Sequence, residues 1–229
     1  MTRLARLSLM TAAGLVALLI VGYIGVVRPW HMRWGATDDE VAMRLAGDAL
    51  AAPDAVASTR AITIHAPAAT VWAWLVQTGQ NRGGDWYSYE WLENLFAAGM
   101  HPVTHIDPRL QDLKVGDQLF MSMGAASNPI MAVRVQSLEK DRLLVLSGGW
   151  TFALMPLDAA TTRLVVRYPM RPAELVHPAL SFTIFEPAHF VMESGMLLGL
   201  KRAAEADPFL KYQPLPPDQP VEAQTHAGY

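Results

Sequence analysis

The most continuous hydrophobic segment of the chain lies near its N-terminus. Residues 7–27 form an uncharged run of 21 positions, bounded by Arg6 and Arg28. At about 1.5 Å per residue, a helix of this length matches the roughly 30 Å hydrocarbon core of a bilayer. The run therefore predicts one transmembrane helix, and we assign residues 1–30 to a membrane anchor.

A cleaved signal peptide is the alternative interpretation of the same segment. Arg3 and Arg6 resemble the basic start of a signal peptide. However, the hydrophobic run is longer than a usual signal core, and no small-x-small cleavage pattern follows it. Trp30 and Trp34 come next, as interfacial anchors do. We favour a retained single-pass anchor; arginines flank both of its ends, so its orientation in the membrane stays open.

Residues 31–57 are interpreted as a linker. The segment is acidic, rich in alanine and interrupted by Pro53. Thr37 followed by Glu40 is a capping box that predicts a short helix. We expect this linker to lie along the domain that follows it, residues 58–206.

The aromatic residues concentrate in residues 70–96, which hold four of the seven Trp and two of the six Tyr. The first part has helical spacing, with Val71, Trp74 and Leu75 at i, i+3 and i+4, and the glycines that follow predict the end of that helix. Rings of this size are costly to leave in water, so they must pack. Either they plug one end of an ordinary core, or some of them line an apolar cavity for a ligand.

Short strand signals recur between the aromatic stretch and the last helix. In residues 163–168, for example, Leu164, Val166 and Tyr168 alternate with the intervening side chains. Runs of this kind, separated by turn signals, are residues 59–64, 113–121, 130–138, 143–146, 150–155 and 163–168. Such closely spaced runs predict an antiparallel meander with one buried face.

The last regular element is a predicted helix with Pro187 in its first turn, ending near Ala206. It is amphipathic, with Met192, Met196, Leu197 and Leu200 on one side. Residues 207–229 are rich in proline, which predicts a loose tail.

Charge and composition exclude several classes of function. The formal net charge is −3 without a Lys/Arg run, so nucleic acid is not an expected partner. The absence of cysteine excludes a disulfide framework, a thiol nucleophile and thiolate metal sites. His101, His105 and Asp107 have a spacing that could ligate a metal, but adjacent prolines disfavour it and no fourth ligand is evident. We therefore predict no metal and no cofactor, and the sequence does not indicate the oligomeric state.

Several motifs resemble a known superfamily. Residues 61–75 read Ala-Ile-Thr-Ile-x-Ala-Pro-x-x-x-Val-Trp-x-Trp-Leu, and residues 150–157 and 162–167 continue the pattern. These motifs are similar to the START-related superfamily SRPBCC, whose members include polyketide cyclase/dehydrase-like and birch-pollen-allergen-like proteins. Arg-Pro-Trp-His-x-Arg-Trp-Gly-Ala-Thr from residue 28 and Tyr-Ser-Tyr-Glu-Trp-Leu-Glu-Asn from residue 87 are similar to a bacterial, membrane-anchored subgroup of unassigned function.

The resemblance covers roughly residues 28–206 and implies an α+β helix-grip fold. In this fold a curved antiparallel sheet wraps a long C-terminal helix, and an apolar cavity lies between them. The superfamily shares a cavity rather than a catalytic motif, so the resemblance does not supply the ligand.

Two polar residues fall inside the apolar stripe of the last helix, His189 and Glu193. A His four residues before a Glu can hydrogen-bond to it, which would hold the ring and raise its pKa. The two are either a satisfied structural pair near the cavity mouth, or a catalytic pair with His189 as acid/base and Glu193 as its orienter.

The leading hypothesis is a membrane-anchored, non-enzymatic domain that binds a small hydrophobic or amphipathic molecule, lipids included. The alternatives are a cyclase/dehydrase- or hydrolase-like enzyme that uses His189 and Glu193, and a structural accessory protein with a filled core. Neighbouring aromatic positions diverge, so not all of the candidates can face one cavity. The candidate cavity residues are Trp72, Trp74, Trp86, Tyr87, Tyr89, Trp91, Trp150, Phe152, Phe185, His189, Met192, Glu193 and Met196.

Overall fold

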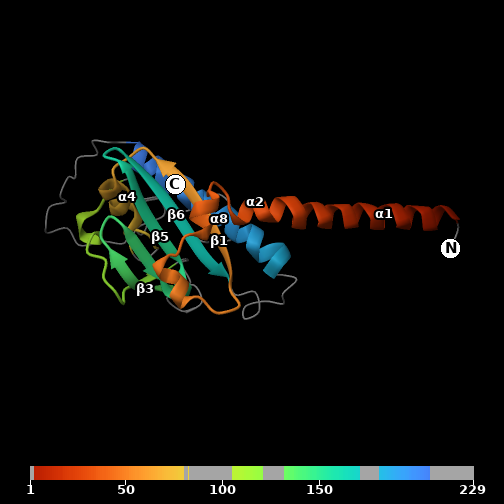
Figure 1. Cartoon of the computed structure of the whole chain (residues 1–229), viewed down its shortest axis with the longest axis horizontal. Helices are drawn as coiled ribbons and strands as arrows, with labels where there is room; N and C mark the ends of the chain where they lie inside the picture. Colours follow the sequence, from red (N-terminus) through yellow and green to blue (C-terminus); the bar gives the residue numbers. More distant parts are fainter. Residues whose placement is uncertain (1–2, 80–81, 83–104, 121–131, 171–180, 207–229) are drawn as a thin grey trace, which may run out of the picture.

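The computed structural model describes residues 3–79, 82, 105–120, 132–170 and 181–206 (Figure 1). The predictions for Trp86, Tyr87, Tyr89 and Trp91, and for the tail, fall outside these residues and stay predictions. The described residues form a sheet-and-helix domain from which a long N-terminal helix projects.

Six strands form one antiparallel sheet with the order β1-β6-β5-β4-β3-β2. The sheet confirms the predicted meander, which β1 joins by pairing along its whole length with β6. The strand bounds are Val56–Ile64 (β1), Gln118–Phe120 (β2), Ala132–Glu139 (β3), Leu143–Leu146 (β4), Thr151–Asp158 (β5) and Thr161–Met170 (β6).

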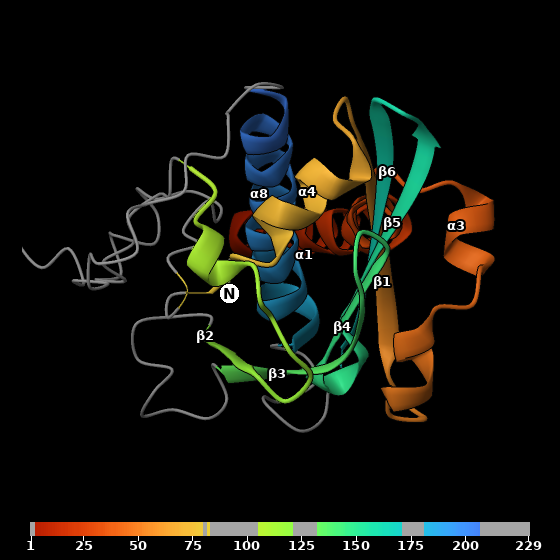
Figure 2. The ribbon, with the colours of Figure 1, turned by 90° about the vertical axis from the view of Figure 1, so that its left-hand side faces the viewer.

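Two helices, α4 (Ala68–Leu75) and α8 (Glu186–Glu205), pack on one face of this sheet (Figure 2). The core lies between the helices and the sheet, and it includes the inner-face residues of β1 and β6 together with Trp72, Trp74, Phe152 and Met196. A sheet packed against a long C-terminal helix confirms the α+β, helix-grip architecture predicted from the sequence.

Helix α8 follows the short π-helix η7 (Ser181–Phe185) and carries Pro187 in its first turn, as predicted. Its side chains at Glu193, Met196 and Leu197 point into the domain. The expectation for Met192 is wrong, because this side chain is 46% exposed. Consecutive residues lie about 100° apart on a helix, so the burial of Glu193 turns Met192 away from the sheet.

Strands β1 and β6 are buried on both faces over most of their length, and β5 over its first half. The expectation of a single buried face is therefore wrong for these strands. Their outer face is covered by the segment that contains α3 (Asp38–Ala42) and the 3-10 helix η2 (Ala46–Leu50) (Figure 2).

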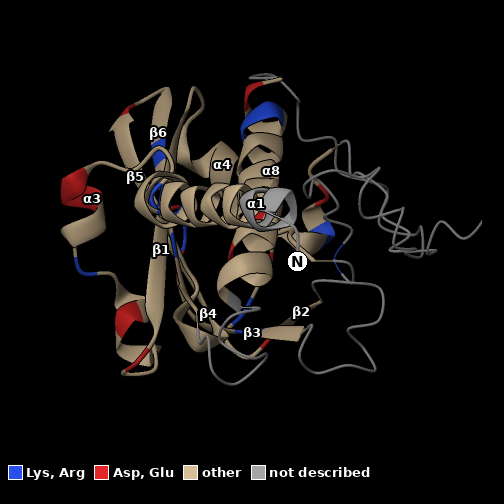
Figure 3. Cartoon of the chain, turned by 90° about the vertical axis from the view of Figure 1, so that its right-hand side faces the viewer, with Lys and Arg blue, Asp and Glu red and all other residues tan. Residues whose placement is uncertain are grey.

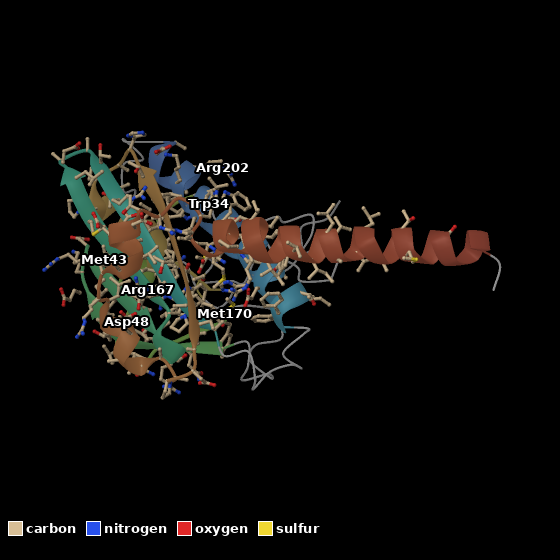
Figure 4. The ribbon with its side chains drawn as sticks, turned by 45° about the vertical axis from the view of Figure 1, so that its right-hand side comes forward. Trp34, Met43, Asp48, Arg167, Met170 and Arg202 are labelled. Carbon is tan, nitrogen blue, oxygen red and sulfur yellow. The ribbon has the colours of Figure 1, made fainter. Side chains whose placement is uncertain are left out.

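Two arginines on the outer face of β6 hold this covering segment. Glu40 completes the predicted capping box with Thr37 and also accepts two hydrogen bonds from Arg163, at 2.6 and 2.8 Å. Arg167 donates to Asp48 at 2.9 Å and to three backbone carbonyls of the segment (Figure 4). Figure 3 shows acidic residues on α3 and basic residues on the sheet. Residues 38–50 thus pack on the sheet through partly buried ion pairs.

The N-terminal helices α1 (Arg3–Gly22), η1 (Tyr23–Val27, a π-helix) and α2 (Arg28–Met32) follow one another without a break. They form a rod of which α1 projects away from the domain (Figure 1). Within the described residues, Met10–Met32 is long and apolar enough to cross a membrane, a property that a signal sequence shares.

The Glu40–Arg163 pair predicts an acid-sensitive contribution to stability. Hydrogen bonds from Arg163 hold the pKa of Glu40 below its usual 4.5. A lowered folded-state pKa means that the pair stabilises the fold above about pH 4.5 and that this contribution is lost as pH falls through the folded-state pKa. We expect Glu40→Gln to cost about 1–3 kcal/mol at pH 7 and to flatten the acid limb of stability, measured by urea unfolding. An acid limb identical to that of the wild type would contradict this assignment.

Candidate functional site

The inner face of β1 changes from apolar to polar halfway along the strand. Ile62 and Ile64 point into the core. Alternate residues of a strand face the same side, so Arg60 and Ser58 also point inward. Arg60 has no exposed side-chain surface. A guanidinium is almost never buried unless it is paired, so its partners define the centre of the candidate site.

Arg60 makes contacts with two helices, α8 and α2. Its Nη1 donates to Glu193 of α8 in a buried ion pair, and it lies 3.3 Å from Nδ1 of His189. Its Nε donates to the backbone carbonyl of His31 in α2 at 2.8 Å. The guanidinium also lies over the ring of Phe190, 5.3 Å from the centroid. One side chain of the sheet therefore joins α8 to the base of the N-terminal rod.

Glu193 is the only buried carboxylate that faces Arg60 among the described residues. Its second oxygen accepts a hydrogen bond from Nε1 of Trp150 at 3.1 Å. Burial raises the pKa of Glu193, and the hydrogen bonds from Arg60 and Trp150 act against this rise. A buried carboxylate with two such donors is a structural ion pair, not a free base.

His189 is held by ring stacking and by Arg60 rather than by Glu193. Its ring stacks on Tyr168 with the centroids 4.1 Å apart, and Trp150 and Phe185 lie on its other sides. Because arginine can only donate, Nδ1 of His189 accepts and the proton of the neutral ring is on Nε2. Burial, with Arg60 as the next cause, lowers the pKa of His189 to about 3.

The sequence-based expectation for His189 is therefore wrong in direction. A hydrogen bond to Glu193 was expected to raise the pKa of the imidazole. In the structure Arg60 lies against both side chains, and no described contact joins Glu193 to His189. The Arg60 guanidinium pairs with the Glu193 carboxylate, and its positive charge disfavours protonation of the His189 ring.

A second polar cluster lies where the N-terminal rod meets the start of α8. Arg28 and Glu186 form a bidentate ion pair with distances of 2.7 and 3.0 Å. The hydroxyl of Tyr23 donates to the carbonyl of Phe182 at 2.9 Å and lies 3.3 Å from Nε2 of His31. His31 connects this cluster to Arg60 through its own carbonyl.

Three buried polar atoms of this region have no hydrogen-bond partner within the described part of the chain. They are Oγ of Ser58, Nη2 of Arg60 and Nδ1 of His31. Ser58 and Arg60 are consecutive inner-face residues of β1, and Ser58 is paired in register with Tyr168. The site therefore offers unused hydrogen-bonding groups at the end of an apolar interior.

The structure brings together only some of the predicted cavity residues. Trp150, Phe185, His189 and Glu193 surround the Arg60 cluster. Trp72, Trp74, Phe152 and Met196 are buried in the apolar core, Met192 is exposed, and Trp86, Tyr87, Tyr89 and Trp91 fall outside the described residues.

Sequence reasoning missed the residues that organise the site, namely Arg60, His31, Tyr23, Arg28 and Glu186. One signal was available, because Arg60 occupies an inward position in a strand whose next inward residues are isoleucines. The others have no local signal, since their partners come from distant parts of the chain.

The metal spacing considered for residues 101–107 receives no support from the described residues. Asp107 is already bound by Arg109 through both carboxylate oxygens. No group of three or more His, Asp or Glu side chains in the described ranges is arranged to hold a metal ion. His101 lies outside the described residues.

No protein-family model matches the chain, and no curated protein matches it significantly. Among solved structures, similar chains include a conserved protein of unknown function from Enterococcus faecalis, with 15% identity and a TM-score of 0.38 over 68% of this chain and 74% of that one. A protein from Chromobacterium violaceum has 14% identity and a TM-score of 0.40 over 68% and 100%. A polyketide-cyclase-like protein from Corynebacterium glutamicum has 17% identity and a TM-score of 0.31 over 68% and 90%. The superfamily resemblance seen in the sequence agrees with the strand order and the position of α8.

The Arg60–Glu193 pair predicts a non-additive mutational cycle. Glu193→Leu leaves a buried cation unpaired, and Arg60→Met leaves a buried carboxylate unpaired, so each should cost about 3–5 kcal/mol. The double substitution removes both charges, and we expect it to cost clearly less than either single change. Urea unfolding of the detergent-solubilised full chain, monitored by tryptophan fluorescence, gives the stability of the wild type, the two single variants and the double variant. Additive losses would show that the pair is not coupled.

The lowered pKa of His189 predicts a pH dependence of stability. Below about pH 6.5 His189 is protonated in the unfolded chain but stays neutral in the folded protein. The free energy of unfolding therefore falls as the pH is lowered from 6.5 to about 3. His189→Gln keeps an acceptor for Arg60 without a titrating group, and should remove up to about 1.4 kcal/mol per pH unit from this slope. His65→Gln, at an exposed position, is the matched control. Equal slopes for wild type and His189→Gln would refute a buried neutral ring.

Proposed function

We propose that this chain is a membrane-anchored protein that binds a small hydrophobic or amphipathic molecule, lipids included, between the sheet and α8. The apolar part of the molecule packs against the core side chains. Its polar end meets the cluster around Arg60. Binding, rather than a reaction, is the proposed activity.

The observation that carries this proposal is the pair of unused polar atoms on the inner face of β1. Nη2 of Arg60 and Oγ of Ser58 are buried and have no partner among the described residues. Leaving a buried donor unpaired costs about 1–3 kcal/mol, and native proteins rarely tolerate it. A ligand with a polar end group would satisfy both atoms, while its chain extends along the apolar interior.

The membrane part of the proposal is supported by the N-terminal rod. Met10–Met32 has the length and hydropathy of a membrane span, and its apolar 18-residue stretch is not buried in the domain. Its base is joined to the domain by the Arg28–Glu186 ion pair and by the hydrogen bond from Tyr23 to η7. A helix joined in this way is built as part of the folded protein, which favours retention over cleavage.

The enzyme alternative requires His189 to gain or lose a proton during a reaction. Its Nδ1 is occupied by Arg60 and its pKa is about 3, far from the range in which a general base is effective. Glu193 is committed to Arg60 and Trp150. The geometry therefore favours a positioning role for both residues over an acid/base role.

The test is to identify what the full chain carries when it is purified in detergent. Native mass spectrometry, followed by extraction and identification of bound molecules, is applied to the wild type and to Arg60→Met/Glu193→Leu. We expect the wild type to carry one class of amphipathic molecule, enriched over the bulk lipid extract by about tenfold or more. The double variant should lose this enrichment, because it removes the polar end of the site.

Arg142→Met is the matched control, because it removes an exposed arginine paired with Glu139 and should leave the bound molecule unchanged. Identical extracts from wild type and double variant would contradict the proposal and favour a structural protein with a filled core. If His189→Ala abolishes turnover of the bound compound while sparing its binding, the non-catalytic assignment is wrong.

A further inference from the structure

The surface around the start of α8 is apolar to an unusual degree for a helix end. From residue 181 to residue 192 the only charged side chain is Glu186, which is buried and paired with Arg28. Ile184 is 61% exposed, and Val191 and Met192 are exposed on the following turns. A water-facing first turn would normally carry acidic or polar side chains.

This apolar surface is fixed against the N-terminal rod. The ring of Phe182 packs edge-on against Tyr23, with the centroids 5.6 Å apart, and the guanidinium of Arg28 lies 4.8 Å from the Phe182 centroid. The Tyr23 hydroxyl also donates to the carbonyl of Phe182. Further along, the ring of Trp30 packs edge-on against Phe190. The start of α8 therefore lies beside the rod, and Figures 1 and 4 both show it on the side of the domain from which α1 projects.

The depth of η7 follows from these contacts. Tyr23 belongs to the uncharged run of residues 7–27, and it precedes Arg28 by five residues, or roughly 7.5 Å along the helix axis. If Arg28 marks the headgroup level, Tyr23 lies at the edge of the hydrocarbon. Phe182, which contacts Tyr23, must then lie at the same depth.

We propose that η7 and the first turns of α8 form a second membrane contact, in which Ile184 and its exposed apolar neighbours are inserted into the lipid interface beside α1. This inference rests on the anchoring half of the proposed function. The lipid bilayer is the partner of this apolar surface, because a membrane-spanning α1 brings the surface to the bilayer without any further association. The burial of Glu186 by Arg28 removes the one charge that would oppose insertion.

The inference also gives the binding site a direct route to its ligand. His189 lies one helical turn after Phe185, and its ring is part of the Arg60 cluster. With η7 in the interface, the polar end of the site is within about two turns of the lipid headgroups, since a turn advances about 5.4 Å. An amphipathic molecule would then pass between bilayer and interior without crossing water.

The chain has no cysteine, so single labels can be placed on it without background. Ile184→Cys, labelled with the environment-sensitive dye NBD, is compared with Leu157→Cys in the full chain reconstituted into phosphatidylcholine vesicles. Leu157 is similarly exposed, at 60%, but lies near the β5–β6 hairpin, away from α1 (Figure 1). Leu18→Cys in α1 reports the anchor itself. NBD emission and its quenching by lipids brominated on the acyl chains are the two readouts.

We expect the label at Ile184 to be blue-shifted and quenched by brominated lipid at least threefold more than the label at Leu157. A label at Ile184 that behaves like the label at Leu157, while the label at Leu18 is quenched, would overturn the inference and leave the anchor intact. If the label at Leu18 is also unquenched, the anchoring proposal itself fails. A blue shift at Ile184 without quenching by lipid would show that protein, such as a second copy, covers this surface, and would also overturn the inference.

Discussion

The buried guanidinium of Arg60 is the constraint on which the architecture depends. Removing such a charge from water costs several kcal/mol, and only well-placed partners offset it. Those partners come from two elements: Glu193 from α8 and a backbone carbonyl of His31 from the rod. Trp150 in turn donates a hydrogen bond to Glu193. The sheet, the C-terminal helix and the base of the N-terminal rod must therefore be in place together.

The same network relates the interior of the domain to the N-terminal rod. The ion pair of Arg28 with Glu186 and the hydrogen bond that Arg60 donates to the carbonyl of His31 both join the rod to the domain. On the outer face of the sheet, Arg163 and Arg167 hold the covering segment in a comparable way. Arginine suits these roles because its fork of donors can bind carboxylates and carbonyls at once.

The surroundings of His189 decide its protonation state. The ring is stacked, partly buried and next to a fixed cation, so it stays neutral and presents Nε2–H as a donor. Together with the unused atoms of Ser58 and Arg60, it makes the site a set of hydrogen-bonding groups. Such a set supports the proposed binding of a polar end group.

Local periodicity in the sequence determined the strands, the capped turn at Thr37 and the last helix with its Pro187, because these features depend on residues within a few positions of one another. The partner of Glu193 depended on tertiary structure. Sequence reasoning assigned it to His189, four residues away, whereas the fold gives it to Arg60, 133 residues away. A period identifies which face of an element is buried, but only the packing of elements decides which buried charges meet.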